Sequence, residues 1–190
     1  AVAHLPRVRR HLNLVQLGAN DARELPLLPK DVDERRHVEP FLGSGALFFA
    51  REPTRALLSD VNAALINTYY WVQAEPRKIV ERVKRHLSTH TEELYYSRRD
   101  KFNNGARDSD KAVLFLYLNK TCFNGLYRVN SEGKFNVPSG MYENPTLDKE
   151  GILQASVVLA GSVHVCVRDF ERTAAFVECG DFVYLDPPYD

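Results

Sequence analysis

The sequence predicts an α/β protein built on a Rossmann-like parallel sheet. Three observations support this fold class. An apolar strand turns tightly at Gly43 and Gly45 and runs into an apolar helix. A second short strand ends in the carboxylate of Asp60, and a further apolar run at 182–185 stops abruptly at residues 186–189. Because the carboxyl ends of parallel strands meet at one edge of a sheet, these features are expected to form one ligand site.

The composition is that of an ordinary globular domain. Of the 190 residues, 44% are hydrophobic and 26% are charged, which argues against a disordered chain. The formal net charge is zero, so a nucleic acid would have to meet a local basic patch. No apolar run reaches the ~18–20 residues of a membrane span. The three cysteines form no metal-type spacing and no disulfide framework, which indicates a reduced, cytoplasmic protein that binds no metal.

The glycine turn and the acidic residue after it form the first candidate site. Gly43 and Gly45 permit a positive φ and let the backbone approach a ligand closely. An acidic residue that ends the second strand of such a unit usually accepts hydrogen bonds from the hydroxyl pair of a ribose, which is the role predicted for Asp60. The same carboxylate could also cap the helix that begins at Val61.

A large insertion separates the second strand from the next one. A doubly wound core needs a single helix there, whereas roughly a hundred residues intervene, well beyond an ordinary connection. We therefore divide the chain into residues 1–61, an inserted mainly helical subdomain at 62–160, and a return to the core at 161–190. Apolar positions predict one helix from Pro76, with a basic outer face, and another over 112–118. A solvated helix face explains those basic residues better than phosphate binding does.

The insertion also contains a predicted β-hairpin. Residues 127–130 and 134–137 flank the turn Ser131-Glu132-Gly133. A two-stranded ribbon can enter the major groove of DNA, where Lys120, Arg128 and Lys134 could reach guanine edges or phosphates. Many hairpins carry such side chains for solubility alone.

The end of the chain returns to the sheet. Residues 163–167 alternate as a strand that closes at Asp169-Phe170, and residues 171–178 are expected to form the crossover helix. The strand at 182–185 follows, and two prolines then remove two backbone donors and stiffen the turn. A carboxylate and a phenol ring bracket that turn, so we predict a catalytic loop at 186–189.

Taken together, these motifs resemble a known family. The stretch Glu39-Pro-Phe-Leu-Gly-Ser-Gly-Ala, the stretch Ser59-Asp-Val-Asn, the segment 119–140 and the final Asp-Pro-Pro-Tyr are similar to Dam-type (α-group) DNA adenine-N6 methyltransferases. The resemblance runs from about residue 25 to residue 190. It implies a class I methyltransferase core with S-adenosylmethionine as cofactor. By resemblance, the cofactor residues are Glu39, Pro40, Phe41, Gly43, Gly45, Asp60, Asp169, Phe170 and Asp186.

The resemblance also assigns the hairpin to target reading. Double-stranded DNA is the implied partner, and the family suggests the sequence GATC and a role in restriction–modification. The expected DNA contacts are Lys120, Asn124, Leu126, Arg128 and Lys134, with Asn124 shaping the loop. The protein is expected to act as a monomer.

The predicted chemistry is methyl transfer to an exocyclic amine. The nitrogen is a poor nucleophile because its lone pair is delocalised into the ring. The Asp186 carboxylate and the Pro187 carbonyl would accept its two hydrogens and expose the lone pair. Pro188 holds the turn rigid, and the base, flipped out of the duplex, would stack on Tyr189. The scheme requires no metal.

Two other functions remain open on the sequence. The final motif also resembles loops of methyltransferases that act on cytosine N4 or on ribosomal RNA. A catalytically inactive DNA-binding remnant is the other alternative. The family carries a Trp-Ala-Gly-Gly-Lys-like stretch near its N-terminus, where this chain has Gln16-Leu-Gly-Ala-Asn20. The family also continues past the catalytic strand. We therefore expect this chain to be an incomplete enzyme, weak or inactive alone.

Overall fold

A parallel sheet forms the centre of the computed structural model, which describes residues 35–187. The sheet has four strands in the order β3-β2-β1-β4. All three pairings are parallel. The strands are β1 (His37–Glu39), β2 (Arg55–Asp60), β3 (Ser162–Val167) and β4 (Phe182–Val183). The predicted α/β class with a Rossmann-like sheet is confirmed.

The order of the strands contains a topological switch point. The chain steps outward from β1 to β2 and β3, and then returns to place β4 on the other side of β1. Ligands of doubly wound sheets bind at the carboxyl edge of such a point, here between β1 and β4. Strand β4 is shorter than the predicted run at 182–185. One further hydrogen bond, from Tyr184 N–H to the Val38 carbonyl (2.9 Å), extends the pairing before the prolines.

Short connections join β1 to β2 and β3 to β4, and the second of these differs from the prediction. Helix α1 (Ala46–Arg51) links β1 to β2, and α7 (Phe170–Ala174) lies between β3 and β4. The predicted crossover helix at 171–178 is therefore too long. Residues 178–181 instead form a turn, in which the Asp181 N–H donates to the Glu178 carbonyl and the Asp181 carboxylate accepts from the Glu178 N–H. That turn brings Asp181 back to the start of β4.

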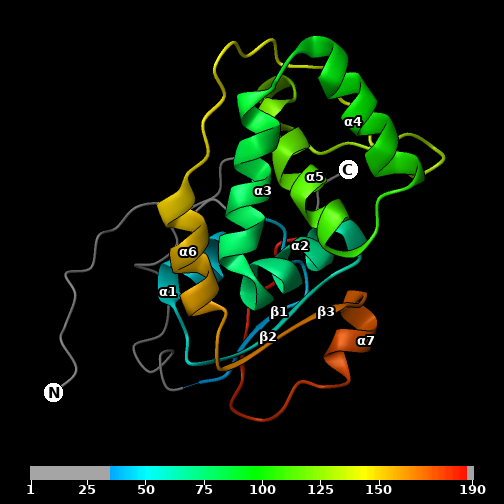
Figure 1. Ribbon diagram of the computed structural model, residues 1–190. Helices are drawn as coiled ribbons and strands as arrows, with labels where there is room; N and C mark the ends of the chain where they lie inside the picture. Colours follow the sequence, from blue (N-terminus) through cyan, green and yellow to red (C-terminus); the bar gives the residue numbers. More distant parts are fainter. Residues whose placement is uncertain (1–34, 188–190) are drawn as a thin grey trace, which may run out of the picture.

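A layer of helices covers one side of the sheet (Figure 1). It comprises α2 (Ala63–Ala74), α3 (Pro76–Ser88), α4 (Glu92–Asn104), α5 (Asp108–Thr121) and α6 (Lys149–Val158). Helix α7 and the segment after it lie on the other side (Figure 1). The predicted helix from Pro76 is confirmed, because its apolar stripe of Ile79, Val80, Val83 and Leu87 is buried. Helix α5 is buried along most of its length and forms the centre of the layer.

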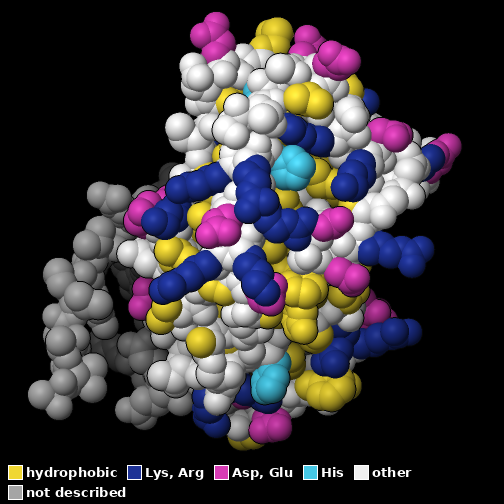
Figure 2. Space-filling model, viewed as in Figure 1, with side chains coloured by type: hydrophobic (Ala, Val, Ile, Leu, Met, Phe, Trp, Pro, Cys, Tyr) yellow, Lys and Arg dark blue, Asp and Glu magenta, His cyan; other side chains and the backbone are white. Residues whose placement is uncertain are grey.

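The basic outer face of α3 is solvent-exposed, as expected. Lys and Arg side chains gather over this part of the surface (Figure 2). Some of them pair locally: Lys78 lies 2.7 Å from Glu75, and Arg82 binds Asp110. Between residues 35 and 187, no helix is long and apolar enough to cross a membrane.

One hydrophobic core joins the sheet to the insertion. The cluster of buried side chains runs from Phe48 of α1 through Tyr69 of α2 and Phe115 of α5 to Phe135 and Val137. Both sides of the proposed boundary at residue 62 therefore contribute to the same core. The division of the chain into three parts stays a prediction.

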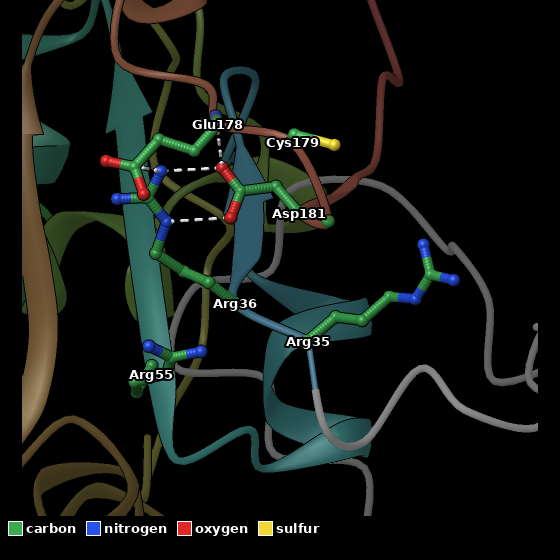
Figure 3. A pocket seen from close by; sticks show the side chains of 7 residues that line it. Arg35, Arg36, Arg55, Glu178, Cys179 and Asp181 are labelled. Atoms are coloured by element: carbon green, nitrogen blue, oxygen red, sulfur yellow. Dashed lines mark hydrogen bonds and ion pairs between the residues drawn. The ribbon is translucent and has the colours of Figure 1, made fainter.

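A charged clamp aligns β4 with β1 at the amino edge of the sheet (Figure 3). Arg36, just before β1, donates from Nε to one Asp181 oxygen (3.0 Å) and from a terminal nitrogen to the other (2.6 Å). The same guanidinium donates to the Phe176 carbonyl at 2.7 Å. The hydrogen bond from Arg36 holds the pKa of Asp181 below its ordinary value. The pocket that these residues line with Arg35 and Arg55 lies at the opposite end of the strands from the predicted site.

Candidate active site

Every strand of the sheet is followed by a carboxylate at its carboxyl edge. Glu39 ends β1 and Asp60 ends β2, while Asp169 and Asp186 follow β3 and β4 within a few residues. The predicted catalytic residue Asp186 and the predicted cofactor residue Glu39 therefore flank the switch point. They are close enough for the charge of Asp186 to contribute to raising the pKa of Glu39, after the larger effect of burial. The edge is strongly acidic, which suits a cationic ligand.

The glycine loop crosses this edge in a left-handed conformation. Gly43 has φ +48° and Gly45 has φ +67°, values that favour glycine. The Leu42 N–H donates to the Ser59 carbonyl of β2 at 3.0 Å, and the Gly45 N–H donates to the Leu42 carbonyl at 2.7 Å. These bonds tie the loop to the end of β2. The loop can therefore let a ligand approach its backbone closely, but the Leu42 and Gly45 amides already donate within the protein and do not serve that ligand.

Asp60 fastens the loop from the second strand. One carboxylate oxygen accepts the Gly43 N–H and the other accepts the Asn62 N–H, each at 2.9 Å. The cap of α2 is Asn62, whose side chain accepts from the Ala64 and Leu65 amides, so Asp60 is not the helix cap that the sequence left open. Each carboxylate oxygen has a second lone pair. Asp60 can therefore still accept hydrogen bonds from a pair of hydroxyl groups.

A tyrosine that the sequence did not single out holds the loop from the other side. The Tyr69 hydroxyl, carried by α2, donates to the Gly43 carbonyl at 3.0 Å. Its side chain is fully buried, and this burial raises the pKa of Tyr69 well above the ordinary value, so the hydroxyl stays protonated and can donate. Both polar backbone groups of Gly43 are thus held by the protein. Tyr69 lies 26 residues from Gly43 in the sequence, and no local motif marks this contact.

A pair of aromatic rings borders the same edge. Phe41, just before the glycine turn, and Phe170, just after Asp169, stack with their centroids 5.4 Å apart. Phe170 is 49% exposed. Asp169 caps α7 by accepting the Arg172 N–H at 2.7 Å. The structure therefore brings together the end of β1 and the end of β3, as predicted, and presents flat apolar surface next to the carboxylates.

A buried chain of hydrogen bonds orients the Glu39 side chain. An arginine can only donate, so Arg51 donates to Nδ1 of His37 at 2.7 Å. His37 is then the neutral tautomer with its proton on Nε2, and it donates that proton to Glu39 at 2.8 Å. His37 and Glu39 are 0% and 3% exposed. Neither His37 nor Arg51 was a predicted site residue; His37 lies two residues before Glu39, on the same face of the strand.

Only the first half of the predicted catalytic loop lies within the described residues. Asp186 is partly buried and Pro187 is exposed, directly beyond the last hydrogen bond of β4. The predicted roles of Pro188 and Tyr189 fall outside the described residues, as does the divergent stretch 16–20. Within 35–187, no group of three or more His, Cys, Asp or Glu side chains is arranged to hold a metal ion.

The open side of Gly43 provides a test of whether a ligand fits. A Cβ placed on Gly43 would meet no atom within 4 Å, whereas one on Gly45 would meet the Phe49 ring at 3.0 Å. The backbone of Gly43 thus faces open space beside Asp60 and the Phe41–Phe170 pair. A carboxylate, two aromatic rings and an accessible stretch of backbone meet beside Gly43. These residues fit a nucleoside that carries a positive charge.

The predicted hairpin forms, but with little regular strand. Its ladder consists of a single antiparallel bridge between Val129 and Phe135, with hydrogen bonds from Asn130 to Lys134 and from Asn136 to Arg128. It is fastened to α4 by Asn103, whose side chain donates to the Phe135 carbonyl (3.0 Å) and accepts the Phe135 N–H (2.9 Å). The hairpin is thus short and is held on α4 through Phe135.

The predicted DNA contacts are all exposed, on the hairpin and on the segment from the end of α5 that leads into it. They are Lys120, Asn124, Leu126, Arg128 and Lys134. Asn124 has φ +52°, which agrees with its predicted role in shaping the loop. Lys134 lies 3.0 Å from Glu132, and Arg128 donates to Asn136 at 3.0 Å, so a ligand would compete with these exposed pairs. Sequence reasoning missed the apolar side chains around them: Phe123, Met141 and Tyr142 are 51%, 82% and 44% exposed.

Comparison with known proteins identifies the family. Residues 25–190 match the family described as D12 class N6 adenine-specific DNA methyltransferase. This chain belongs to that family. The match covers the glycine loop, the hairpin and the final Asp-Pro-Pro-Tyr motif, and the Rossmann-like fold is the one expected for a D12 methyltransferase.

Individual relatives agree with the D12 assignment. A type II methyltransferase of Lactococcus lactis subsp. cremoris is 40% identical over 157 residues, which are 80% of this chain and 55% of the relative. A type II methyltransferase of Methanocaldococcus jannaschii is 38% identical, over 85% of this chain and 62% of the relative. A retron DNA adenine methylase of Escherichia coli is 37% identical, over 82% and 55%. The D12 chain described here thus spans little more than half the length of these relatives.

Proposed function

We propose that this chain carries the site of an S-adenosylmethionine-dependent DNA adenine-N6 methyltransferase. The observation that supports it most is the carboxyl edge of the sheet. There, Asp186 and Glu39 flank the switch point, and the open backbone of Gly43 lies beside Asp60. The proposal concerns the whole protein, because the relatives that suggest the activity are longer than this chain.

The cofactor would be held by its charges and its flat ring. When bound, it supplies a methyl group on a positively charged sulfur. Asp60 would accept the two ribose hydroxyls with its outward lone pairs, since its other lone pairs already hold backbone amides. Glu39, Pro40, Phe41 and Gly45 would complete the pocket around Gly43. Asp169 and Phe170 would border the adenine, and Asp186 would face the sulfonium.

Asp186 and Pro187 would prepare the substrate amine. A carboxylate and a carbonyl accept the two hydrogens of adenine N6, which draws the nitrogen toward tetrahedral geometry and exposes its lone pair. Because both acceptors follow a strand held in the sheet, they are preorganised before the base arrives. Transfer then requires alignment rather than a covalent enzyme intermediate, and no metal. Pro188 and Tyr189 keep the roles predicted for them, rigidity and stacking on the flipped base.

The hairpin would read the duplex. Arg128, Lys134 and Lys120 supply positive charge, and Leu126 and Asn124 lie between them on the same exposed segment. We propose double-stranded DNA as the partner, GATC as the first sequence to try, and a monomer acting in the cytoplasm. The exposed ring of Phe123 adds apolar surface beside the predicted contacts.

Two variants separate cofactor binding from chemistry. Asp60→Asn should weaken S-adenosylmethionine binding at least tenfold in calorimetric titration, because one oxygen that serves the ribose becomes a donor. Asp186→Asn should weaken S-adenosylmethionine binding less than Asp60→Asn does, but at saturating cofactor it should lower methyl transfer to a GATC duplex by a factor on the order of 10²–10³, as for other preorganised acceptors.

Three results would contradict these assignments. Equal binding by the wild type and Asp60→Asn would reject the cofactor site, and undiminished transfer by Asp186→Asn would reject the catalytic loop. DNA affinity without any cofactor binding by the wild type would favour a non-catalytic DNA-binding protein.

A further inference from the structure

A half-buried arginine and a buried histidine connect β4 with the acidic end of β1. The Arg51 guanidinium lies over the Phe182 ring of β4, with its central carbon 4.6 Å from the ring centroid. The His37 ring of β1 lies 5.5 Å from the centroid of Phe182 and 6.1 Å from that of Phe48 on α1. The two side chains that precede Glu39 in the chain of hydrogen bonds are therefore held by three elements, α1, β1 and β4.

The hydrogen bonds of His37 leave no place for a second proton on its ring. Nδ1 accepts from Arg51 at 2.7 Å and Nε2 donates to Glu39 at 2.8 Å, so both ring nitrogens are occupied while the ring is neutral. A proton on Nδ1 would turn two donors, and two positive charges, toward each other. Arg51 therefore keeps His37 neutral.

A neutral donor has a particular consequence for Glu39. A carboxylate paired directly with an arginine or a lysine has its charge neutralised within the protein, and so attracts a cationic ligand weakly. His37 instead supplies a hydrogen bond that favours the ionised carboxylate and adds no charge of its own. The positive charge of Arg51 lies behind the imidazole, and the charge of Glu39 stays available to a ligand.

The other titratable groups near this carboxylate do not replace the donor. They come from neighbouring elements: Asp186 beyond β4, Asp60 at the end of β2, and Tyr69 on α2. Asp60 binds backbone amides, and the Tyr69 hydroxyl donates to the glycine loop. Burial and the charge of Asp186 both raise the pKa of Glu39, and the His37 hydrogen bond opposes them. Without that bond, the acid form of Glu39 would be favoured.

We propose that Arg51 and His37 are positioning residues that keep Glu39 charged and in place for a cationic cofactor. The inference rests on the proposed function, which assigns S-adenosylmethionine to this edge of the sheet. Both side chains act through Glu39, and neither needs to contact the cofactor. Because Arg51 also packs on Phe182, the same chain ties Glu39 to the strand that leads to Asp186.

The first test uses the protein without ligands. Nitrogen-15 NMR of the His37 ring at pH 7 should show a neutral imidazole with its proton on Nε2. Arg51→Met keeps an apolar stem but frees Nδ1, so the ring should gain a second proton and become an imidazolium beside Glu39. A proton on Nδ1 in the wild type, or a neutral ring in Arg51→Met, would overturn the proposal.

A matched control removes a buried hydrogen bond elsewhere. The Tyr95 hydroxyl, on α4, donates to the Val137 carbonyl at 2.8 Å, and its side chain is fully buried. Tyr95→Phe should leave the His37 spectrum unchanged. A spectrum altered as in Arg51→Met would show that any loss of a buried hydrogen bond disturbs His37, which would overturn the role given to Arg51.

The second test measures the charge of Glu39 through cofactor affinity. Calorimetric titration with S-adenosylmethionine at pH 8 and pH 6 gives the ratio of wild-type to variant affinity, in which the titration of the ligand itself cancels. His37→Phe keeps a packed ring but removes the donor, so the pKa of Glu39 should rise and its charge should be lost at the lower pH. The ratio should be about tenfold larger at pH 6 than at pH 8, as for a shift of one pKa unit.

A conservative variant separates this role from a structural one. The amide of His37→Gln can donate to Glu39 and accept from Arg51, so its ratio should stay within about threefold of unity at both pH values. A ratio for His37→Phe that does not change with pH, or an equal pH dependence in His37→Gln, would overturn the inference. If the wild type binds no S-adenosylmethionine, the proposed function fails, and the NMR experiment still decides whether Arg51 holds His37 neutral.

Discussion

Gly43 and Gly45 share a left-handed backbone but serve different purposes. Added side chains at the two positions would meet different surroundings, because Gly43 faces open space and Gly45 faces the Phe49 ring. The first glycine therefore leaves room for a ligand, and the second leaves room for the core. This difference cannot be recognised in the sequence, where the two are equivalent members of one Gly-x-Gly turn.

Alanine substitutions should separate these two roles. A left-handed alanine costs about 1–2 kcal/mol at either position. Gly45→Ala should cost a further ~1–3 kcal/mol in the free energy of unfolding, because its methyl group overpacks against Phe49. Gly43→Ala should show only the first cost but should weaken S-adenosylmethionine binding at least tenfold. Urea unfolding and calorimetric titration of both variants give the comparison. Equal stability of the two variants would contradict the assignment.

At the scale of elements, the position of β4 depends on the clamp at the amino edge. Strand β4 makes a short ladder with β1, so few backbone hydrogen bonds hold it. Arg36 and Asp181 join the residues just before these two strands, and the Asp181 side chain is only 6% exposed. The clamp thus supports the strand that delivers Asp186 to the opposite edge.

Removing the clamp should lower stability in a pH-dependent way. Asp181→Asn should reduce the free energy of unfolding by about 1–3 kcal/mol at pH 7, because Arg36 loses its charged partner. Arg36 holds the pKa of Asp181 below 3.8, so the clamp stabilises fully above that pH, and its contribution is lost as the pH falls through the lowered pKa. The difference in the free energy of unfolding between the wild type and Asp181→Asn should therefore become smaller at acid pH. Urea unfolding from pH 7 to pH 2.5 measures it.

A neighbouring carboxylate provides the control for that experiment. Glu178 lies 3.9 Å from Arg36, and its side chain is 77% exposed. Glu178→Gln should change the free energy of unfolding by less than ~0.5 kcal/mol, as is usual for exposed pairs. A loss as large as that of Asp181→Asn would show that general charge at this edge, and not the two-pronged clamp, stabilises β4.

On the scale of the whole molecule, one core spans the sheet and the insertion. Buried residues of α1, α2, α5 and the hairpin belong to the same cluster. Elements that share a core unfold together, which is the behaviour of small single domains.

Unfolding of the chain should therefore be a single transition. The only tryptophan, Trp71, lies on α2 and reports on the junction between sheet and insertion. Its fluorescence and the far-ultraviolet circular dichroism of all helices should give the same urea midpoint. Two separated midpoints would instead support an insertion that folds on its own, as the proposed boundary at residue 62 implies.

The sequence by itself determined the class of the fold and the set of residues at the strand ends. Glycines, prolines and carboxylates next to apolar strands are local signals, because they restrict φ, stop a ladder or end an element at their own position. Such signals predicted Gly43, Asp60, Asp169 and Asp186, all of which lie at the carboxyl edge of the sheet. They overestimated β4 and α7, whose ends depend on pairing with distant residues.

Only the tertiary structure decided how those residues are held. Tyr69, His37 and Arg51 act through partners that are distant in sequence or that lie on other elements. A hydrogen bond across elements depends on the orientation of two backbones, and no short pattern encodes that orientation. The glycine loop is an example. Two glycines in the sequence predict its turn, but the hydrogen bonds of Gly43 with Asp60 and Tyr69 form only once α2 has packed against the sheet.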